Sequence, residues 1–228
     1  MNIADNLQKI QKEITDCARV CGRDPQSIQL IAVSKHHPIA SIQEAMACGQ
    51  ILFGENYIQE AEKKCKKLPG ASFHFIGHIQ SNKARQAASL FSMVETVDRF
   101  KLAKLLNKHL EQLEKDLNIL VQVNIGQDPV KSGISAEQTG ELLQQIAQLP
   151  RVHAKGLMTI PPLQEDKEKT RNYFKSLRLL SIKLAEKNLF ADNSAVELSM
   201  GMSQDFSIAI EEGATLIRVG TSIFGPRG

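Results

Sequence analysis

The residues of this sequence that could do chemistry stand at the ends of short apolar runs, and the first of them is a lysine. The run over residues 28–33 stops at Ser34 and Lys35. At the end of a buried strand a lysine amine is poorly solvated, which disfavours its charged form and makes the neutral amine available to condense with a carbonyl group. Lys35 is therefore a candidate for Schiff-base formation, although most lysines at strand ends simply reach solvent.

Two apolar runs near the C-terminus end in glycine and small hydroxyl residues. One is followed by Gly201 and Ser203, and the other by Gly220 and Thr221. Glycine allows close approach to the backbone, and helices that open at these points offer N–H and hydroxyl donors, which together suit a phosphate group. The alternative is a pair of tight turns in which Ser203 and Thr221 are ordinary helix N-caps. A lysine that faces a phosphate cradle is typical of a pyridoxal phosphate (PLP) site.

Short runs rich in Val and Ile alternate with longer amphipathic stretches, and this alternation predicts βαβ units with a buried parallel sheet. The runs cover residues 28–34, 51–53, 73–76, 93–97, 119–125, 152–160, 195–199 and 215–219. The helical stretches cover residues 39–47, 57–67, 82–88, 100–115, 136–149, 167–187 and 204–211. Such a pattern in 228 residues predicts an α/β fold of the (β/α)8 or TIM-barrel type, with an open doubly wound sheet as the second choice.

An additional helix is predicted ahead of this repeat, because apolar residues from Ile3 to Cys21 recur at steps of three and four and the stripe ends near Gly22. No linker rich in Pro, Gly or Ser interrupts the chain. We therefore predict one domain over residues 1–228, with its site at the C-terminal ends of the barrel strands.

Composition argues against several other classes of protein. The net charge is only +3, and nine Phe, two Tyr and no Trp give few stacking platforms, so no nucleic-acid partner is expected. The lysines at 63, 64, 66 and 67 are interpreted as a solvated helix face. No run of 18 apolar residues occurs, so no membrane span is expected. The four cysteines lack metal or disulfide spacing and are expected to be free thiols, which favours a cytoplasmic protein.

A metal site and the common nucleotide and hydrolase motifs are not expected either. His74 and His78 are four residues apart but straddle Gly77 at a strand end, so the helical geometry of a zinc pair does not apply. His36 and His37 follow Lys35 directly and cannot both face the site, because consecutive residues of an extended strand point to opposite sides.

Several motifs that occur in order over nearly the whole chain resemble those of a known family. They are Ala32-Val33-Ser34-Lys35, Phe53-Gly54-Glu55-Asn56-Tyr57, His74-Phe75-Ile76-Gly77, Gln80-Ser81-Asn82-Lys83, Lys131-Ser132-Gly133, Gly156-Leu157-Met158, Gly201-Met202-Ser203 and Arg218-Val219-Gly220-Thr221. This set resembles the pyridoxal phosphate homeostasis protein family, whose fold is similar to the barrel domain of alanine racemase.

The resemblance implies a role for six residues. It implies that Lys35 holds PLP as an internal aldimine and that Ser203, Gly220 and Thr221 bind the phosphate. It also implies that Asn56 lines the pocket beside the cofactor ring. Arg218 is implied to face the pyridine nitrogen.

An arginine at the pyridine nitrogen has a chemical consequence. A carboxylate there would hold a proton on the nitrogen and make the ring a strong electron sink, whereas the permanent charge of Arg218 keeps the nitrogen unprotonated and weakens carbanion stabilisation. Alanine racemase also draws a second base from an additional C-terminal domain, which we do not expect here because the sequence stops at Gly228. Tyr57 remains a candidate acid or base at the barrel mouth.

The sequence supports one leading hypothesis and two alternatives. The first is a monomeric carrier that binds PLP on Lys35 and buffers or delivers it to apo forms of PLP-dependent enzymes, without robust turnover. The second is a weak PLP-dependent amino-acid racemase or transaminase that uses the same lysine. The third is an aldolase-like lyase acting on a sugar phosphate, which explains Lys35 and the phosphate cradle but not Arg218.

Overall fold

The strands of the protein form a closed barrel. The structure is a computed structural model that describes residues 2–162 and 166–226. Its strands are β1 (Gln29–Val33), β2 (Leu52–Glu55), β3 (Ser72–Phe75), β4 (Met93–Val97), β5 (Leu117–Gln122), β6 (Val152–Met158), β7 (Glu197–Met202) and β8 (Leu216–Val219). They pair in parallel in chain order, and β8 returns to pair with β1, so that Arg218 stands opposite Ile31.

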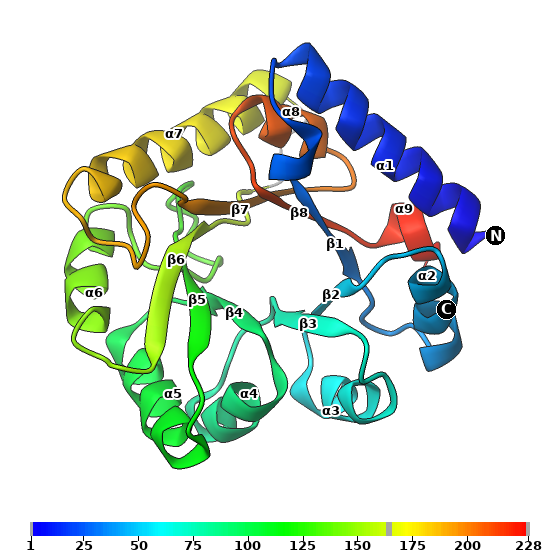
Figure 1. Ribbon diagram of the computed structural model, residues 1–228. Helices are drawn as coiled ribbons and strands as arrows, with labels where there is room; N and C mark the ends of the chain where they lie inside the picture. The colour runs from blue at the N-terminus through cyan, green and yellow to red at the C-terminus, as the bar shows by residue number, and fades with distance from the viewer. Residues whose placement is uncertain (1, 163–165, 227–228) are drawn as a thin grey trace.

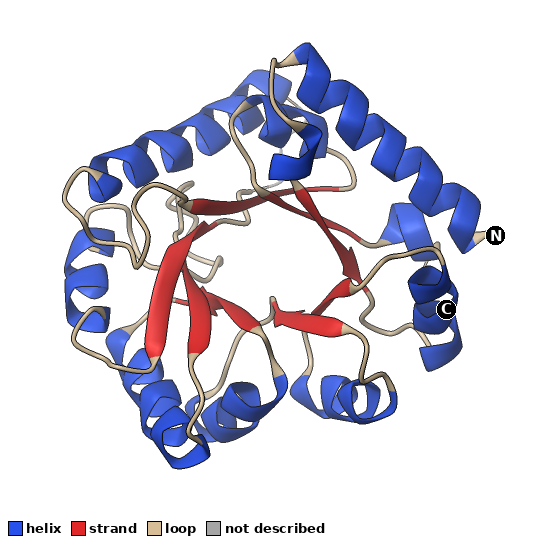
Figure 2. Ribbon diagram, in the orientation of Figure 1, coloured by secondary structure: helices blue, strands red, loops and turns tan. Residues whose placement is uncertain are grey.

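Helices surround this barrel on its outside (Figures 1 and 2). They are α1 (Ile3–Val20), α2 (Ile39–Ala47), α3 (Ile58–Lys67), α4 (Ala84–Leu90), α5 (Phe100–Leu113), α6 (Thr139–Ile146), α7 (Lys167–Ala185), α8 (Phe206–Glu211) and α9 (Thr221–Phe224), with 3-10 turns at Pro25–Ser27 and Ser81–Lys83. The predicted (β/α)8 barrel with an additional N-terminal helix is therefore confirmed. None of the described helices is long and apolar enough to cross a bilayer.

The additional helix α1 packs against the end of the chain. Its predicted apolar stripe is buried and consists of Ile3, Leu7, Ile10, Ile14 and Ala18. Figure 1 shows α1 alongside α8 and α9, and the Asn6 side-chain amide donates to the Ile223 carbonyl at 2.9 Å. This helix thus supports the turn after β8, where Gly220 and Thr221 lie.

The inside of the barrel is filled by side chains and is not a pore. An apolar cluster there consists of Ile31, Met93, Leu120, Met158 and Leu216. Arg218 lies two residues beyond Leu216 on the same strand and is also buried. Because alternate residues of a strand face the same side, polar side chains follow this apolar cluster toward the C-terminal ends of the strands.

The strand predicted over residues 195–199 is wrong in extent, because β7 continues to Met202. Gly201 has a φ of +90°, and the pairing with β8 shifts register between Ser199 and Met202. A Cβ at Gly201 would lie 2.5 Å from the Ala209 Cβ in α8. The glycine therefore kinks the strand and lets α8 pack closely on it, whereas the sequence pattern suggested that the strand stops before it.

The prediction of a solvated lysine face on residues 57–67 is wrong at one position. Lys63, Lys66 and Lys67 are exposed, but Lys64 is only 3% exposed. Its side chain turns inward between α3 and the barrel, where two carboxylates accept hydrogen bonds from it. No disulfide joins any of the four cysteines in the described part of the chain.

Candidate ligand site at the barrel mouth

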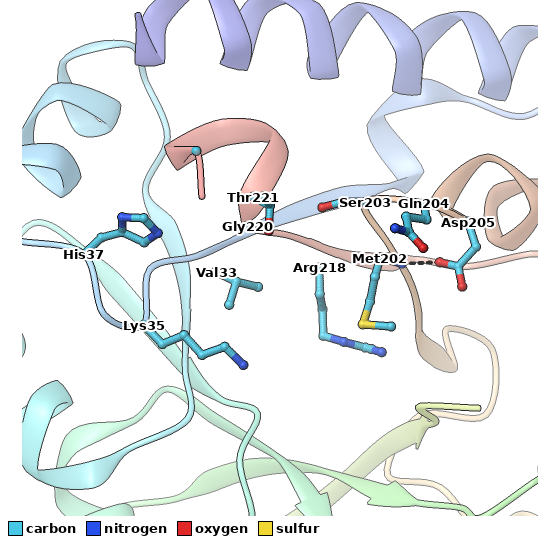
Figure 3. A pocket seen from close by; sticks show the side chains of 11 residues that line it. Val33, Lys35, His37, Met202, Ser203, Gln204, Asp205, Arg218, Gly220 and Thr221 are labelled. Carbon is cyan, nitrogen blue, oxygen red and sulfur yellow. Dashed lines mark hydrogen bonds between the residues drawn. The ribbon is translucent and has the colours of Figure 1, made fainter. Parts of the chain in front are cut away.

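A cavity of about 250 Å³ lies at the C-terminal ends of β1, β7 and β8. Its lining includes five of the six predicted site residues, namely Lys35, Ser203, Arg218, Gly220 and Thr221. Figure 3 shows the Lys35 side chain extending toward the part of the cavity that holds Arg218. Lys35 and Gly220, which are 185 positions apart in sequence, therefore meet because barrel closure places β1 next to β8.

The part of this cavity near the C-terminus has the features of an anion cradle. Gly220 precedes the short helix α9, and no side chain caps that helix. A Cβ at Gly220 would lie 3.2 Å from both the Cβ and the carbonyl oxygen of Val33, so a larger residue would crowd β1. The Thr221 and Ser203 side chains border the same space. These residues supply two hydroxyl groups around a backbone that has room for a ligand.

The segment that carries Ser203 is held by a carboxylate. Asp205 Oδ1 accepts a hydrogen bond from the backbone N–H of Met202 at 2.6 Å, and the backbone N–H of Asp205 donates to the Met202 carbonyl at 3.1 Å. Burial raises the pKa of Asp205, and the nearby Arg218 charge opposes that shift. The cavity lining thus combines two basic side chains, Lys35 and Arg218, with one acidic side chain, Asp205, which favours an anionic ligand.

Arg218 faces the barrel interior, as predicted from its place on the last strand, and is 3% exposed. Its guanidinium donates to the Thr159 carbonyl at 2.8 Å and to Ser199 Oγ. Ser199 Oγ donates in turn to Glu95, which also contacts His74 Nδ1 at 2.7 Å. Burial lowers the pKa of Arg218, while the Glu95 and Asp205 charges oppose this effect. This chain of contacts fixes the guanidinium and balances its buried charge.

The hydrogen-bonded series of His74, Glu95 and Ser199 was not predicted from the sequence. His74 was weighed only as a metal ligand, and the described residues contain no group of three His, Cys, Asp or Glu side chains that could hold a metal ion. Polar residues at alternate positions within apolar strands were the available signal, because alternate positions share the inward face of a barrel.

Asn56 lies apart from the other predicted site residues. It follows β2 and lines a neighbouring cavity of about 420 Å³ that also contains Tyr57, His78 and Lys83. Its Oδ1 is buried and has no hydrogen-bond partner among the described residues. The Asn56 backbone is packed against Gly77, where a Cβ would lie 2.3 Å from the Asn56 carbonyl oxygen. The structure therefore does not bring Asn56 into the cavity that Lys35 lines.

The two histidines after Lys35 point in different directions. The His36 ring lies 5.1 Å from the Tyr57 ring, centroid to centroid, on the side of α3. The His37 ring stacks on Phe224 at 4.9 Å and lines the cavity. Only His37 borders the site, as predicted, but the reason differs: the pair lies in a turn after β1, where His36 has a left-handed backbone, and not on an extended strand.

The fold and the cavity at the barrel mouth define a protein of the alanine racemase N-terminal domain class. The family model of that domain matches residues 3–228. Alanine racemase from Clostridium difficile 630 shares this fold with a TM-score of 0.76, at 14% identity over 99% of this chain and 56% of that protein.

Two proteins with higher sequence identity to this chain identify the family within this class. A pyridoxal phosphate homeostasis protein from Pseudomonas aeruginosa is 42% identical over 99% of this chain and 96% of its own length. The structure of PipY from Synechococcus elongatus PCC7942 with PLP bound has 38% identity and a TM-score of 0.84, over 98% of this chain and 100% of PipY. The chain belongs to the pyridoxal phosphate homeostasis protein family.

Proposed function

We propose that this protein binds PLP as a Schiff base on Lys35 and takes part in PLP homeostasis by buffering or delivering the cofactor, without robust catalytic turnover. The observation that carries this proposal is the meeting of Lys35, Arg218 and the Gly220–Thr221 turn in one cavity. The PLP bound to PipY supports it, as do curated relatives named as homeostasis proteins rather than as enzymes.

The residues of the cavity fit the functional groups of PLP. The Lys35 amine can condense with the aldehyde, so that a C=N bond forms and the carbonyl oxygen leaves as water. Ser203, Gly220 and Thr221 are the residues that would hold the phosphate, because they line the cavity with two hydroxyl groups and a glycine backbone. Arg218 would face the pyridine nitrogen. Hydrolysis reverses the condensation, and a carrier needs this reversibility to release its cargo.

The anchoring of Arg218 supports carriage over catalysis. Bound PLP supplies an electron sink for carbanion chemistry, and that sink is strong when its ring nitrogen is protonated. The Arg218 guanidinium keeps its positive charge and is fixed by Thr159 and Ser199, so it disfavours a second positive charge on the nitrogen. We therefore infer weak activation of amino acids at this site.

We further propose the setting in which this carrier acts. Residues 1–228 form one PLP-binding domain that is monomeric and cytoplasmic and has no nucleic-acid or membrane partner. The apo forms of PLP-dependent enzymes are the proposed recipients of the cofactor. Asn56, which follows β2 and lines the cavity beside that of Lys35, is proposed to lie next to the cofactor ring.

The direct test is the absorption spectrum of the purified protein incubated with PLP, before and after borohydride reduction. We expect a visible band that reduction removes, and a reduced adduct that peptide mass mapping locates at Lys35. The Lys35→Ala variant should lack this modified peptide. A protein that stays colourless and unmodified would contradict PLP binding and favour the sugar-phosphate lyase, whereas rapid racemisation of added L-alanine would favour the racemase.

The phosphate assignment predicts a selective loss of affinity. Thr221→Val removes a hydroxyl donor but keeps the side-chain shape, and a hydrogen bond to a charged group contributes about 1.5–3 kcal/mol. We expect PLP to bind roughly tenfold or more weakly, while pyridoxal, which has no phosphate, binds as it does to the wild type. Equilibrium titrations with both compounds measure this difference.

The neighbouring hydroxyl provides the control for this substitution. Ser222 lies in the same short helix but does not line the cavity. Ser222→Ala should therefore leave both affinities unchanged. Equal losses for PLP and pyridoxal in Thr221→Val would show that Thr221 does not contact the phosphate.

A further inference from the structure

A buried charged cluster lies behind the turn that carries Lys35, and it consists of Glu55, Glu60 and Lys64. Lys64 comes from α3, and its side chain is only 4% exposed. Its ammonium donates three hydrogen bonds of 2.7 Å, to Glu55 Oε1, to Glu60 Oε1 and to the Ser34 carbonyl. All three N–H donors of the ammonium are therefore used.

These contacts hold the chain on both sides of Lys35. On the N-terminal side, the Ser34 carbonyl accepts from Lys64 and the Ser34 hydroxyl donates to Glu55 Oε1 at 2.6 Å. On the C-terminal side, the His36 backbone N–H donates to Glu60 Oε1 at 2.7 Å. The residues before and after Lys35 are thus fixed to one cluster.

The backbone of this turn needs such support. His36 has a φ of +64°, in the left-handed region that residues other than glycine rarely adopt. A conformation of this kind persists only where the surrounding structure holds it. Here the hydrogen bond from the His36 N–H to Glu60 supplies one such restraint.

The burial of this cluster is costly, which argues that it has a specific use. Glu55 is fully buried, and its Oε2 has no hydrogen-bond partner among the described residues. Burial raises the pKa of Glu55, against the opposing effects of Lys64 and Ser34. Apolar side chains of similar volume often replace a buried ion pair without loss of stability, so stability alone does not explain its presence.

We propose that Lys64, Glu55 and Glu60 are positioning residues that fix the Ser34–His36 turn so that the Lys35 amine enters the cavity in the geometry needed for Schiff-base formation. This inference rests on the proposed function of Lys35. It adds that the Glu55–Glu60–Lys64 cluster determines the rate and the extent of the reaction between the Lys35 amine and PLP.

The test uses Glu60→Ala, because the Glu60 side chain is 25% exposed and its loss leaves the Lys64–Glu55 pair in place. Two ligands distinguish an effect on Schiff-base formation from an effect on ligand binding in general. PLP reports Schiff-base formation through its absorbance after rapid mixing, and pyridoxine 5′-phosphate, which has no aldehyde, reports only phosphate and ring binding. We expect Glu60→Ala to form the Schiff base about tenfold more slowly or more weakly, which is about 1.4 kcal/mol, with unchanged binding of pyridoxine 5′-phosphate.

Matched controls exist on the same helix. Glu62 and Lys66 form an ion pair with the same i, i+4 spacing at 2.8 Å, but their side chains are 38% and 69% exposed. Glu62→Ala should therefore behave like the wild type with both ligands.

Glu60→Gln keeps an acceptor for the His36 N–H and should restore most of the rate. Lys64→Met, examined at a temperature where circular dichroism shows it folded, should give the largest loss.

The outcomes separate this inference from the proposed function. A folded Glu60→Ala protein that reacts with PLP as Glu62→Ala does would overturn the positioning role alone. Equal losses for PLP and pyridoxine 5′-phosphate would also overturn it, because general damage to the mouth would then explain them. A wild-type protein without an adduct at Lys35 would instead contradict the proposed function itself.

Discussion

Arg218→Glu should make this protein a measurable, if slow, catalyst of Cα–H exchange in amino acids. A carboxylate at the pyridine nitrogen would hold a proton there and strengthen the electron sink. We expect exchange of the Cα hydrogen of L-alanine in D2O, followed by NMR, to be at least about tenfold faster than in the wild type, which corresponds to about 1.4 kcal/mol of activation free energy.

Arg218→Glu should also destabilise the folded protein, and this loss of stability must be measured separately from the rate of Cα–H exchange. Arg218 is buried and linked through Ser199 to Glu95. Removing one partner of a buried charge network costs about 3–5 kcal/mol, and a new glutamate adds repulsion with Glu95. Combining Arg218→Glu with Glu95→Gln removes that repulsion and should recover part of the stability.

Two further variants make the result interpretable. Arg218→Met removes the guanidinium without supplying a carboxylate and should raise exchange less than Arg218→Glu. Glu95→Gln alone tests the contribution of the buried network. If an Arg218→Glu protein folds, retains PLP and exchanges the Cα hydrogen no faster than the wild type, the proposal that Arg218 limits carbanion chemistry at this site is wrong.

Gly156→Ala should strongly destabilise the barrel. Gly156 in β6 pairs with Glu197 in β7, and a Cβ at Gly156 would lie 1.8 Å from the Glu197 carbonyl oxygen and 2.7 Å from its backbone nitrogen. Backbone atoms of a paired strand cannot move aside as a flexible side chain can. Overpacking of this kind costs about 3 kcal/mol, and for a domain of this size that lowers the melting temperature by about 10 °C.

The effect of Gly156→Ala should reach the ligand site as well as the fold. The same pair of strands leads to Thr159 and Ser199, which hold the Arg218 guanidinium. We therefore expect weaker PLP binding even at temperatures where the variant is folded. Thermal unfolding followed by circular dichroism and a PLP titration measure the two effects.

The control for this prediction is another glycine. Gly140 lies in α6, where a Cβ would be 3.4 Å from the Leu184 Cδ2, an ordinary contact with a side-chain methyl group. Alanine also favours a helix over glycine by about 1 kcal/mol. Gly140→Ala should therefore be neutral or stabilising. A Gly156→Ala protein that melts at the same temperature as Gly140→Ala would show that β6 and β7 can separate without cost.

Much of the barrel could be predicted because its strands and helices follow from residue patterns within short segments of the sequence. Short Val- and Ile-rich runs favour buried strands, and the amphipathic stretches between them favour helices that cover a sheet. The stripe of α1 illustrates this, since the spacing from Ile3 to Ala18 alone indicates its buried face. Boundaries were harder to predict, as in β7, where Gly201 kinks the strand instead of ending it.

The sequence by itself determined the alternation of strands and helices, the inward orientation of Arg218 and the chemical types of the residues at the mouth, because strand periodicity and residue chemistry are local properties. Only the tertiary structure decided which polar groups meet. It buried Lys64 against Glu55 behind the Lys35 turn, linked Arg218 to His74 through Ser199 and Glu95, and placed Asn56 in a neighbouring cavity. Such contacts join residues distant in the chain, and they depend on strand register and barrel closure, which no local pattern encodes.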